Sequence, residues 1–324
     1  MSKVRFYIAM AAAKTAHRLL RLCGRAATHT PGAVATKLCP DFLRYLQKPE
    51  TLICVTGTDG KTTVSNLLAT VLQNNGYTVT NNSYGSNICE GVVSALLTDA
   101  TFSGKPKKQV GVLEVDERSS LKVYKYLTPD ILICNNIMRD SLKRNAHTEF
   151  ICYILNKQLP SSTKVVLNAD DLICSGLFPN NKDRTYFGVS ADRPENGAAT
   201  DEALRDIVYC PKCGAKLETE YVRYNHIGRH HCSSCGFASP KPDYDVTAIN
   251  REKGTFTVTH NGVDEEYKIV NDNIINIYNS CAVISVLHTF GLDYEKIHNA
   301  FETVKIVSSR FDIKKVGDYT IIGQ

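Results

Sequence analysis

The segment 51–75 constrains the fold more than any other part of this sequence. Thr51–Thr56 is an apolar run suited to a buried parallel strand, and the glycine-containing turn Gly57–Gly60 follows it. In Lys61–Asn75 the apolar residues recur at helical spacing. A strand that leads through a tight turn into a helix is typical of an α/β fold, in which helices cover a parallel sheet.

The rest of the chain continues this alternation. Further strand-like and helix-like stretches follow one another at Gln109–Val115, Asp130–Cys134 and Thr163–Leu167 (strands) and at 88–97, 149–158, 274–290 and 294–303 (helices). Between them, alternating apolar residues at 245–250, 254–259 and 265–270 predict a small antiparallel β portion. The sequence therefore predicts a mainly parallel sheet with an antiparallel addition.

The turn after the first strand has the composition of a phosphate-binding loop. Its glycines allow backbone N–H groups to face phosphate oxygens, and the following helix N-terminus favours negative charge. Lys61 would reach the β- and γ-phosphates, and the Thr62 hydroxyl would bind Mg²⁺. The full eight-residue pattern is not met, because Val55 stands at its first glycine. We predict that nucleotide is bound by Gly57, Thr58, Asp59, Gly60, Lys61, Thr62 and Thr63, here called the phosphate loop.

Four cysteines occur in two Cys-x-x-Cys pairs, and each pair is followed by glycine. The spacing between the pairs is typical of a structural zinc site, with Cys210, Cys213, Cys232 and Cys235 as ligands. His226, His230 and His231 lie between the pairs, and we interpret them as solvated loop histidines. Lys212, Lys216, Arg223 and Arg229 with two tyrosines leave nucleic-acid binding as a disfavoured alternative for this cysteine ribbon.

The distribution of charge limits the kinds of partner the chain can bind, and the cysteines indicate its cellular compartment. Residues 1–40 contain seven Lys or Arg and no acid, which leaves 31 basic and 33 acidic residues elsewhere. A body of this charge argues against a nucleic-acid partner. Isolated cysteines indicate a reducing, cytoplasmic location. The basic amphipathic stretch 3–23 has three interpretations: a packing helix, a targeting peptide, or peripheral contact with the inner face of the membrane.

The phosphate loop resembles the ATP loop of the Mur ligase superfamily. Other motifs of that superfamily are resembled, in the same order, by Leu113–Glu117, Asn135–Asp140, Asn168–Asp171, Asn276–Asn279 and Ser309–Asp312. The resemblance implies ATP and Mg²⁺ as cofactors, with Mg²⁺ held by Thr62 and Glu114. It also implies catalytic roles for Lys61 and Glu114 and nucleotide contacts from Asn168, Asn279 and Arg310.

Within this superfamily, the chain is similar to the MurT branch, the ligase subunits of lipid II isoglutaminyl synthase. The cysteine ribbon and the segments Leu22–Arg25, Asn82–Asn87 and Arg139–Arg144 carry this resemblance. It implies that ATP activates the α-carboxylate of D-glutamate in lipid II as an acyl phosphate. Ammonia from a GatD-like glutamine amidotransferase subunit would then give D-isoglutamine, a step of peptidoglycan and cell wall biosynthesis.

The resemblance also implies a domain organisation. We expect a basic amphipathic arm at 1–48, a central ATP-binding domain at 49–312, the inserted ribbon at 205–240 and the start of a truncated C-terminal domain at 313–324. Mur-type ligases need that last domain, so the activity of this chain by itself is an open question. Two alternatives remain: a Mur-type ligase that adds an amino acid, and a non-catalytic pseudo-ligase that binds ATP and zinc.

Overall fold

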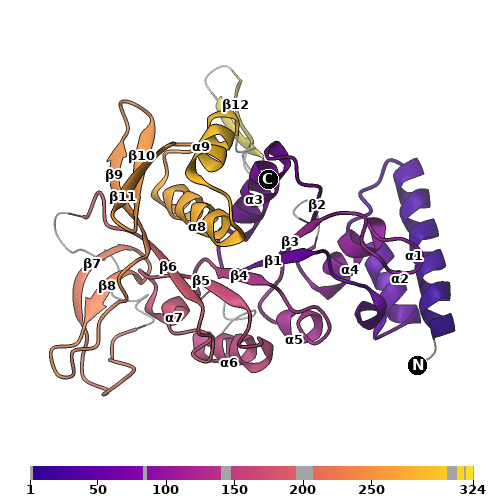
Figure 1. Cartoon of the computed structure of the whole chain (residues 1–324), viewed down its shortest axis with the longest axis horizontal. Helices are drawn as coiled ribbons and strands as arrows, with labels where there is room; N and C mark the ends of the chain where they lie inside the picture. Colours follow the sequence, from indigo (N-terminus) through magenta and orange to yellow (C-terminus); the bar gives the residue numbers. More distant parts are fainter. Residues whose placement is uncertain are drawn as a thin grey trace.

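A large twisted sheet forms the centre of the computed structural model, which describes residues 3–82, 86–139, 147–194 and 207–304 and two further strands at 312–316 and 319–323 (Figure 1). In the described residues the sheet has nine strands. Their bounds are β1 (Thr51–Thr56), β2 (Val79–Asn81), β3 (Val110–Glu114), β4 (Ile131–Cys134), β5 (Lys164–Asn168), β6 (Arg184–Val189), β9 (Tyr244–Asn250), β10 (Thr255–His260) and β11 (Val263–Lys268). The strand order is β11-β10-β9-β6-β5-β4-β1-β3-β2.

The sheet is parallel from β2 to β9 and antiparallel at its β10–β11 edge. The predicted α/β class and the antiparallel portion are therefore confirmed. The antiparallel strands extend the main sheet, because β9 pairs in parallel with β6, with Phe187 opposite Tyr244. The sequence did not predict β6, whose first three residues are only half-buried.

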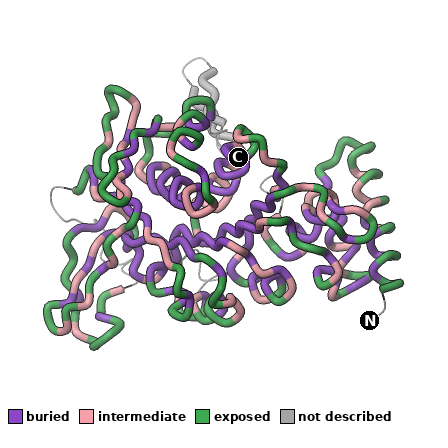
Figure 2. The backbone as a smooth tube through the Cα atoms, in the orientation of Figure 1, coloured by how far each residue is buried: buried purple, intermediate pink, exposed green. Residues whose placement is uncertain are grey.

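Helices cover both faces of the sheet (Figure 1). One face carries α3 (Lys61–Asn74), α8 (Ile274–Phe290) and α9 (Tyr294–Thr303), and the other carries α4 (Cys89–Thr98), α5 (Ser120–Val123), α6 (Thr148–Gln158) and α7 (Leu172–Ser175). Strand β1 shows the consequence: Ile53 and Val55 enter one core, and Leu52 and Cys54 enter the other. Because both faces are buried, the strand is apolar throughout, and Figure 2 shows the central strands as a buried band.

Helix α8 is apolar on all sides because it is enclosed by the sheet and by α3. The side chain of Asn273 caps its start by accepting the N–H of Ile275 at 2.9 Å. Gly291, with φ +108°, ends it in the left-handed conformation that glycine adopts without strain. The predicted bounds of α8 and α9 are confirmed.

The N-terminal helices form a layer against α4. This layer contains α1 (Lys3–Leu22), α2 (Thr30–Leu38) and a short 3₁₀ helix η1 (Phe42–Tyr45). Helix α1 buries Phe6 and Met10 in the core, and Lys14 Nζ donates to the carbonyls of Leu97 and Ala100 at 2.7 and 2.8 Å. Helix α1 is therefore a packing helix along one of its faces.

The cysteine ribbon lies between β6 and β9 in the sequence and forms a small unit at one end of the sheet (Figure 1). Its two strands, β7 (Glu218–Tyr224) and β8 (Ile227–His231), pair as an antiparallel hairpin. A further antiparallel pair, β12 (Asp312–Val316) and β13 (Tyr319–Gly323), follows α9.

The contact between α2 and α4 depends on Gly32. A Cβ at this position would lie 1.8 Å from the carbonyl oxygen of Glu90, and the Gly32 N–H donates to Ser94 Oγ at 2.7 Å. We expect Gly32→Ala to separate the helices and to lower the free energy of unfolding by about 1–3 kcal/mol, the usual cost of overpacking. Urea denaturation measures this loss. The exposed-site control Lys37→Ala on α2 should change stability by less than about 0.5 kcal/mol. Equal losses in the two variants would contradict the packing argument.

Candidate nucleotide site and cysteine cluster

The phosphate loop connects the carboxyl end of β1 to the N-terminus of α3. Gly57 and Gly60 have φ of +124° and +81°, values that side chains on L-residues rarely allow. Both positions also have too little space for a side chain. At Gly57 an added Cβ would lie 2.9 Å from Asn136 O, and at Gly60 it would lie 2.3 Å from Asn279 Oδ1. No side chain caps the start of α3 at Gly60, which suits an anion at the helix N-terminus.

The segment Asn135–Met138, here called the clamp segment, follows β4 and holds the phosphate loop by hydrogen bonds. The Asp59 N–H donates to Asn136 Oδ1, and the Thr58 N–H donates to Asn136 O, both at 2.9 Å. The Met138 N–H donates to Thr58 Oγ1 at 2.8 Å. These bonds fix the backbone that would surround phosphate.

Asn168 supports the clamp segment from β5. Its Nδ2 donates to Asn135 O at 3.0 Å, and its Oδ1 accepts the Asp170 N–H at 3.0 Å. The side chain is buried, and both of its polar atoms are bound within the chain. A direct nucleotide contact from Asn168 stays a prediction.

Lys61 points back onto the loop and pairs with Glu117. Lys61 Nζ lies 3.1 Å from Glu117 Oε1, and the Gly57 N–H donates to the same oxygen at 3.2 Å. Burial raises the pKa of Glu117, while the charge of Lys61 opposes this rise. The Lys61 ammonium and the Gly57 N–H, two donors suited to phosphate, are therefore bound to a carboxylate. A nucleotide that used these donors would have to replace the carboxylate as their acceptor. The sequence did not single out Glu117, although it lies in the same acidic segment as Glu114.

Thr62 and Glu114 lie together, as the magnesium prediction requires. Thr62 Oγ1 donates to Glu114 Oε2 at 2.9 Å, and Asn87 Nδ2 donates to Glu114 Oε1 at 3.1 Å. Asn82 fixes the backbone of Glu114 through its N–H at 2.7 Å and its carbonyl at 2.8 Å. A hydroxyl and a carboxylate beside a phosphate loop are the oxygen ligands that Mg²⁺ prefers, with the remainder coming from phosphate and water. These residues fit that ion.

Of the remaining predicted nucleotide ligands, the structure brings Asn279 to the loop. It lies in the second turn of α8, and its side chain abuts Gly60. Thr63 lies half-buried in the first turn of α3. Arg310, like Asp140 and Ser141 in the motif after β4, lies outside the described residues.

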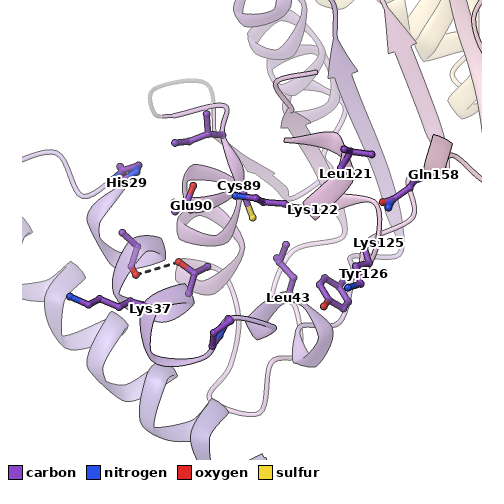
Figure 3. Close-up of a pocket in the computed structure, with 14 residues that line it drawn as sticks. His29, Lys37, Leu43, Cys89, Glu90, Leu121, Lys122, Lys125, Tyr126 and Gln158 are labelled. Carbon is purple, nitrogen blue, oxygen red and sulfur yellow. Dashed lines mark hydrogen bonds between the residues drawn. The ribbon is translucent and has the colours of Figure 1, made fainter. Parts of the chain in front are cut away.

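A cavity of about 910 Å³ opens between α2, α4 and α5 (Figure 3). Its lining includes basic side chains from two stretches of chain, His29 and Lys37 at α2 and Lys122 and Lys125 at α5, together with the acid Glu90 of α4. Ile88, which also lines the cavity, follows Asn87, the partner of Glu114. The lining of the cavity is therefore adjacent in sequence to a residue that contacts Glu114.

The four paired cysteines converge at the end of the ribbon. Their Sγ atoms all lie within 4.8 Å of one another, with Cys210–Cys235 at 3.6 Å and Cys213–Cys232 at 3.5 Å. In a tetrahedral site with Zn–S bonds of about 2.3 Å, sulfur atoms lie about 3.8 Å apart. Gly214 and Gly236 complete two matching turns with φ of +75° and +71°. The donor set fits a closed, structural zinc site, and zinc as its ion stays a prediction.

The interpretation of the ribbon histidines was wrong for two of the three. His226 and His230 are 2% and 5% exposed, whereas His231 is half-buried, with a side chain that is 42% exposed and lies beside Glu218. The reason is that the hairpin packs against the main domain, where Arg229 pairs with Asp170 at 3.0 Å. Arg223 likewise donates to main-chain carbonyls at 189–192.

The Thr62 hydroxyl can be tested with an isosteric change. We expect Thr62→Val to weaken Mg²⁺-dependent ATP binding by about tenfold or more, a loss typical of even an outer-shell partner of a metal. Isothermal titration with and without Mg²⁺ measures this. Thr70→Val, a control in the same helix whose hydroxyl only bonds to Asn66 O, should bind like the wild type. Unchanged Mg²⁺ dependence in Thr62→Val would remove this residue from the ion site.

The chain can be compared with known proteins on this basis. Residues 55–233 match the Mur ligase middle domain. The sequence is 32% identical over 302 residues to the "Lipid II isoglutaminyl synthase (glutamine-hydrolyzing) subunit MurT" of Staphylococcus aureus (strain COL), covering 93% of this chain and 67% of that protein. The subunit of the same name from Streptococcus pneumoniae is 29% identical over 318 residues, covering 96% of this chain and 68% of the relative.

Among solved structures, the fold is similar to a pseudomurein peptide ligase type C from Methanothermus fervidus, with a TM-score of 0.67 and 25% identity. That match covers 88% of this chain and 55% of the other. The chain thus spans about two thirds of the two MurT relatives and about half of the solved structure. The match to the middle domain covers more than half of the 324 residues and includes the phosphate loop, Glu114, the clamp segment and three of the four paired cysteines. The chain belongs to the Mur ligase family.

Proposed function

We propose that this chain performs the ATP-dependent step of a ligase that forms a carbon–nitrogen bond in peptidoglycan biosynthesis. Its reaction is the amidation of the α-carboxylate of D-glutamate in lipid II to D-isoglutamine. The observation that carries the proposal is the phosphate loop with Lys61 beside the Thr62–Glu114 pair. The similarity to two MurT subunits supports the choice of substrate.

The loop and Lys61 bind the phosphates of ATP and stabilise the charge on the transferring phosphoryl group. Mg²⁺, held by Thr62 and Glu114, would neutralise further phosphate charge when bound. A carboxylate oxygen of the substrate forms a bond to the γ-phosphorus while the bond to the β-phosphate oxygen breaks, which gives an acyl phosphate and ADP. Ammonia then bonds to the carbonyl carbon, phosphate leaves with the C–O electron pair, and a proton is lost.

The cavity between α2, α4 and α5 is the place we propose for the acceptor. An acceptor with a carboxylate and a pyrophosphate is strongly anionic, and Lys37, Lys122 and Lys125 supply opposite charge (Figure 3). Ile88 in its lining precedes α4 and follows Asn87, which donates to Glu114, and this supports a place for the acceptor near the proposed magnesium ligand. Both relatives are named glutamine-hydrolysing, which supports a GatD-like glutaminase subunit as the source of ammonia.

The phosphoryl step is tested by Lys61→Ala in a complex with the glutaminase subunit and any further ligase domain. We expect ADP release in the presence of lipid II and glutamine to fall by about 10²–10³-fold, the usual effect of removing one group that stabilises the transition-state charge. Lys107→Ala, at an exposed lysine, is the control and should be fully active. An unchanged rate in Lys61→Ala would contradict the proposal. ADP release that requires an amino acid and not ammonia would replace it with another Mur-type activity.

We further propose that α1 rests on the inner face of the cytoplasmic membrane, where a lipid-linked acceptor resides. On the side of α1 away from the core, Val4, Ile8, Leu19 and Leu22 are 57–83% exposed, and Arg18 and Arg21 are exposed as well. Apolar side chains flanked by basic residues favour an anionic lipid surface. No helix in the described part of the chain is long and apolar enough to cross a membrane.

Substitution tests this face better than deletion, because α1 also carries the buried Phe6 and Met10. We expect Ile8→Glu combined with Leu19→Glu to abolish flotation of the chain with anionic phospholipid vesicles. Val263→Glu changes an equally exposed apolar residue on β11 and should float like the wild type. Flotation of the double variant at the level of the wild type would contradict the membrane contact.

A further inference from the structure

The tip of the β7–β8 hairpin reaches the segments that surround the phosphate loop. Asn225, with φ +49°, makes the turn between the two strands, and His226 follows it. His226 is 2% exposed, and its Nε2 lies 3.1 Å from Asp171 Oδ1. A carboxylate oxygen accepts a hydrogen bond here, so the imidazole donates through Nε2. The ribbon is thereby fixed to a buried acid of the main domain.

Asp171 connects this histidine to the clamp segment. Its Oδ2 accepts the Ile137 N–H at 2.7 Å, and its Oδ1 accepts the N–H groups at the start of α7. Ile137 lies between Asn136 and Met138, the two residues that hold Asp59 and Thr58 of the phosphate loop. One carboxylate therefore joins the ribbon to the loop through a single backbone segment.

The neighbouring residues of the hairpin tip make further contacts in the same place. Asn225 Nδ2 lies 2.9 Å from Met138 Sδ, and the ring of Tyr224 packs edge-to-face on Tyr278 with centroids 6.2 Å apart. Burial raises the pKa of Tyr224, and the nearby carboxylates of Asp171 and Asp59 add to the rise. The tip thus lies close to the loop as well as to the clamp segment.

Asp170 provides a second connection, to helix α8. It pairs with Arg229 at 3.0 Å, and its carbonyl accepts the Gly228 N–H at 2.7 Å. Its Oδ2 accepts the hydroxyl of Tyr278 at 2.7 Å. Tyr278 precedes Asn279, whose side chain abuts Gly60. The two adjacent acids therefore tie the ribbon to the clamp segment and to α8, both of which contact the phosphate loop.

The cysteine end of the ribbon contacts the same stretch of chain. Leu172 packs in one apolar cluster with Cys210, Leu217 and Cys232. Leu172 is the first residue of α7, and Asp171 is its N-cap. The candidate zinc site and the His226 contact thus act on two consecutive residues.

We propose that the β7–β8 hairpin is a positioning element for ATP: His226, through Asp171 and the clamp segment, holds the phosphate loop in the form that binds nucleotide, and a folded, zinc-loaded ribbon raises the affinity for ATP. The inference rests on the proposed ATP-binding function. Its physical basis is preorganisation, because a loop held in its binding conformation loses less freedom when ligand binds.

The test compares three variants of the complete protein, each first checked for zinc content and thermal unfolding. We expect His226→Ala to raise the Kd for Mg²⁺–ATP about tenfold, equivalent to about 1.4 kcal/mol, in isothermal titration. His226→Gln keeps a donor at a similar reach and should restore most of the affinity. His231→Ala, at the half-buried histidine of the same hairpin that pairs with Glu218 and not with Asp171, should bind like the wild type. Removing zinc with a zinc-selective chelator should weaken ATP binding as His226→Ala does.

Hydrogen exchange of the ligand-free protein provides an independent measurement. The N–H groups of Thr58 and Asp59 should exchange faster in His226→Ala than in the wild type and His226→Gln. Wild-type affinity and exchange in His226→Ala would overturn the inference. So would equal damage in His226→Ala and His226→Gln with lost zinc, which would indicate a role in folding alone. A wild-type protein that binds no ATP would contradict the proposed function, and exchange at 57–60 would then decide the positioning role alone.

Discussion

The parallel pairing of β1 between β3 and β4 determines where the candidate site lies. In this register Val55 stands opposite Glu114 and Thr56 opposite Cys134, so the three strands end together. The phosphate loop, the carboxylate of Glu114 and the clamp segment all leave the sheet at this edge. Ligands of open α/β sheets bind at the carboxyl ends of their strands for the same geometric reason. A shift of one strand would separate every group on which the proposed chemistry depends.

The carboxylate of Glu117 balances the positive charge of Lys61 in the phosphate loop. Glu117 accepts hydrogen bonds from Lys61 and from the Gly57 N–H, so the half-buried lysine is not left without a counter-charge. A phosphate group must offer these donors more than the carboxylate does. This competition lowers the net gain from phosphate binding, and it also means that the donors have a partner again when the nucleotide leaves.

Local patterns predicted much of this arrangement, and long-range contacts account for the rest. The phosphate loop, the helices α8 and α9 and the four cysteines were found because their signals lie in short stretches of sequence. His226 was misjudged because its burial comes from docking against Asp171, which lies 55 positions earlier. Strand β6 was missed because only its last three residues are buried, so its apolar run is too short to be recognised as a strand. Asn168 was assigned to nucleotide from its motif, while its side chain bonds to the clamp segment.

The position of the cysteine ribbon between two adjacent parallel strands has a consequence for how the chain folds. Strands β6 and β9 pair directly, yet residues 190–243 separate them. The entropy lost on closing such a loop grows with the length of its flexible chain, so a ribbon already compacted around a metal leaves less chain to close. The last parallel pairing, and with it the β9–β11 edge, would then form more readily if a metal were bound early. Metal supply during synthesis would in this way influence the yield of correctly assembled sheet, far from the cysteines themselves.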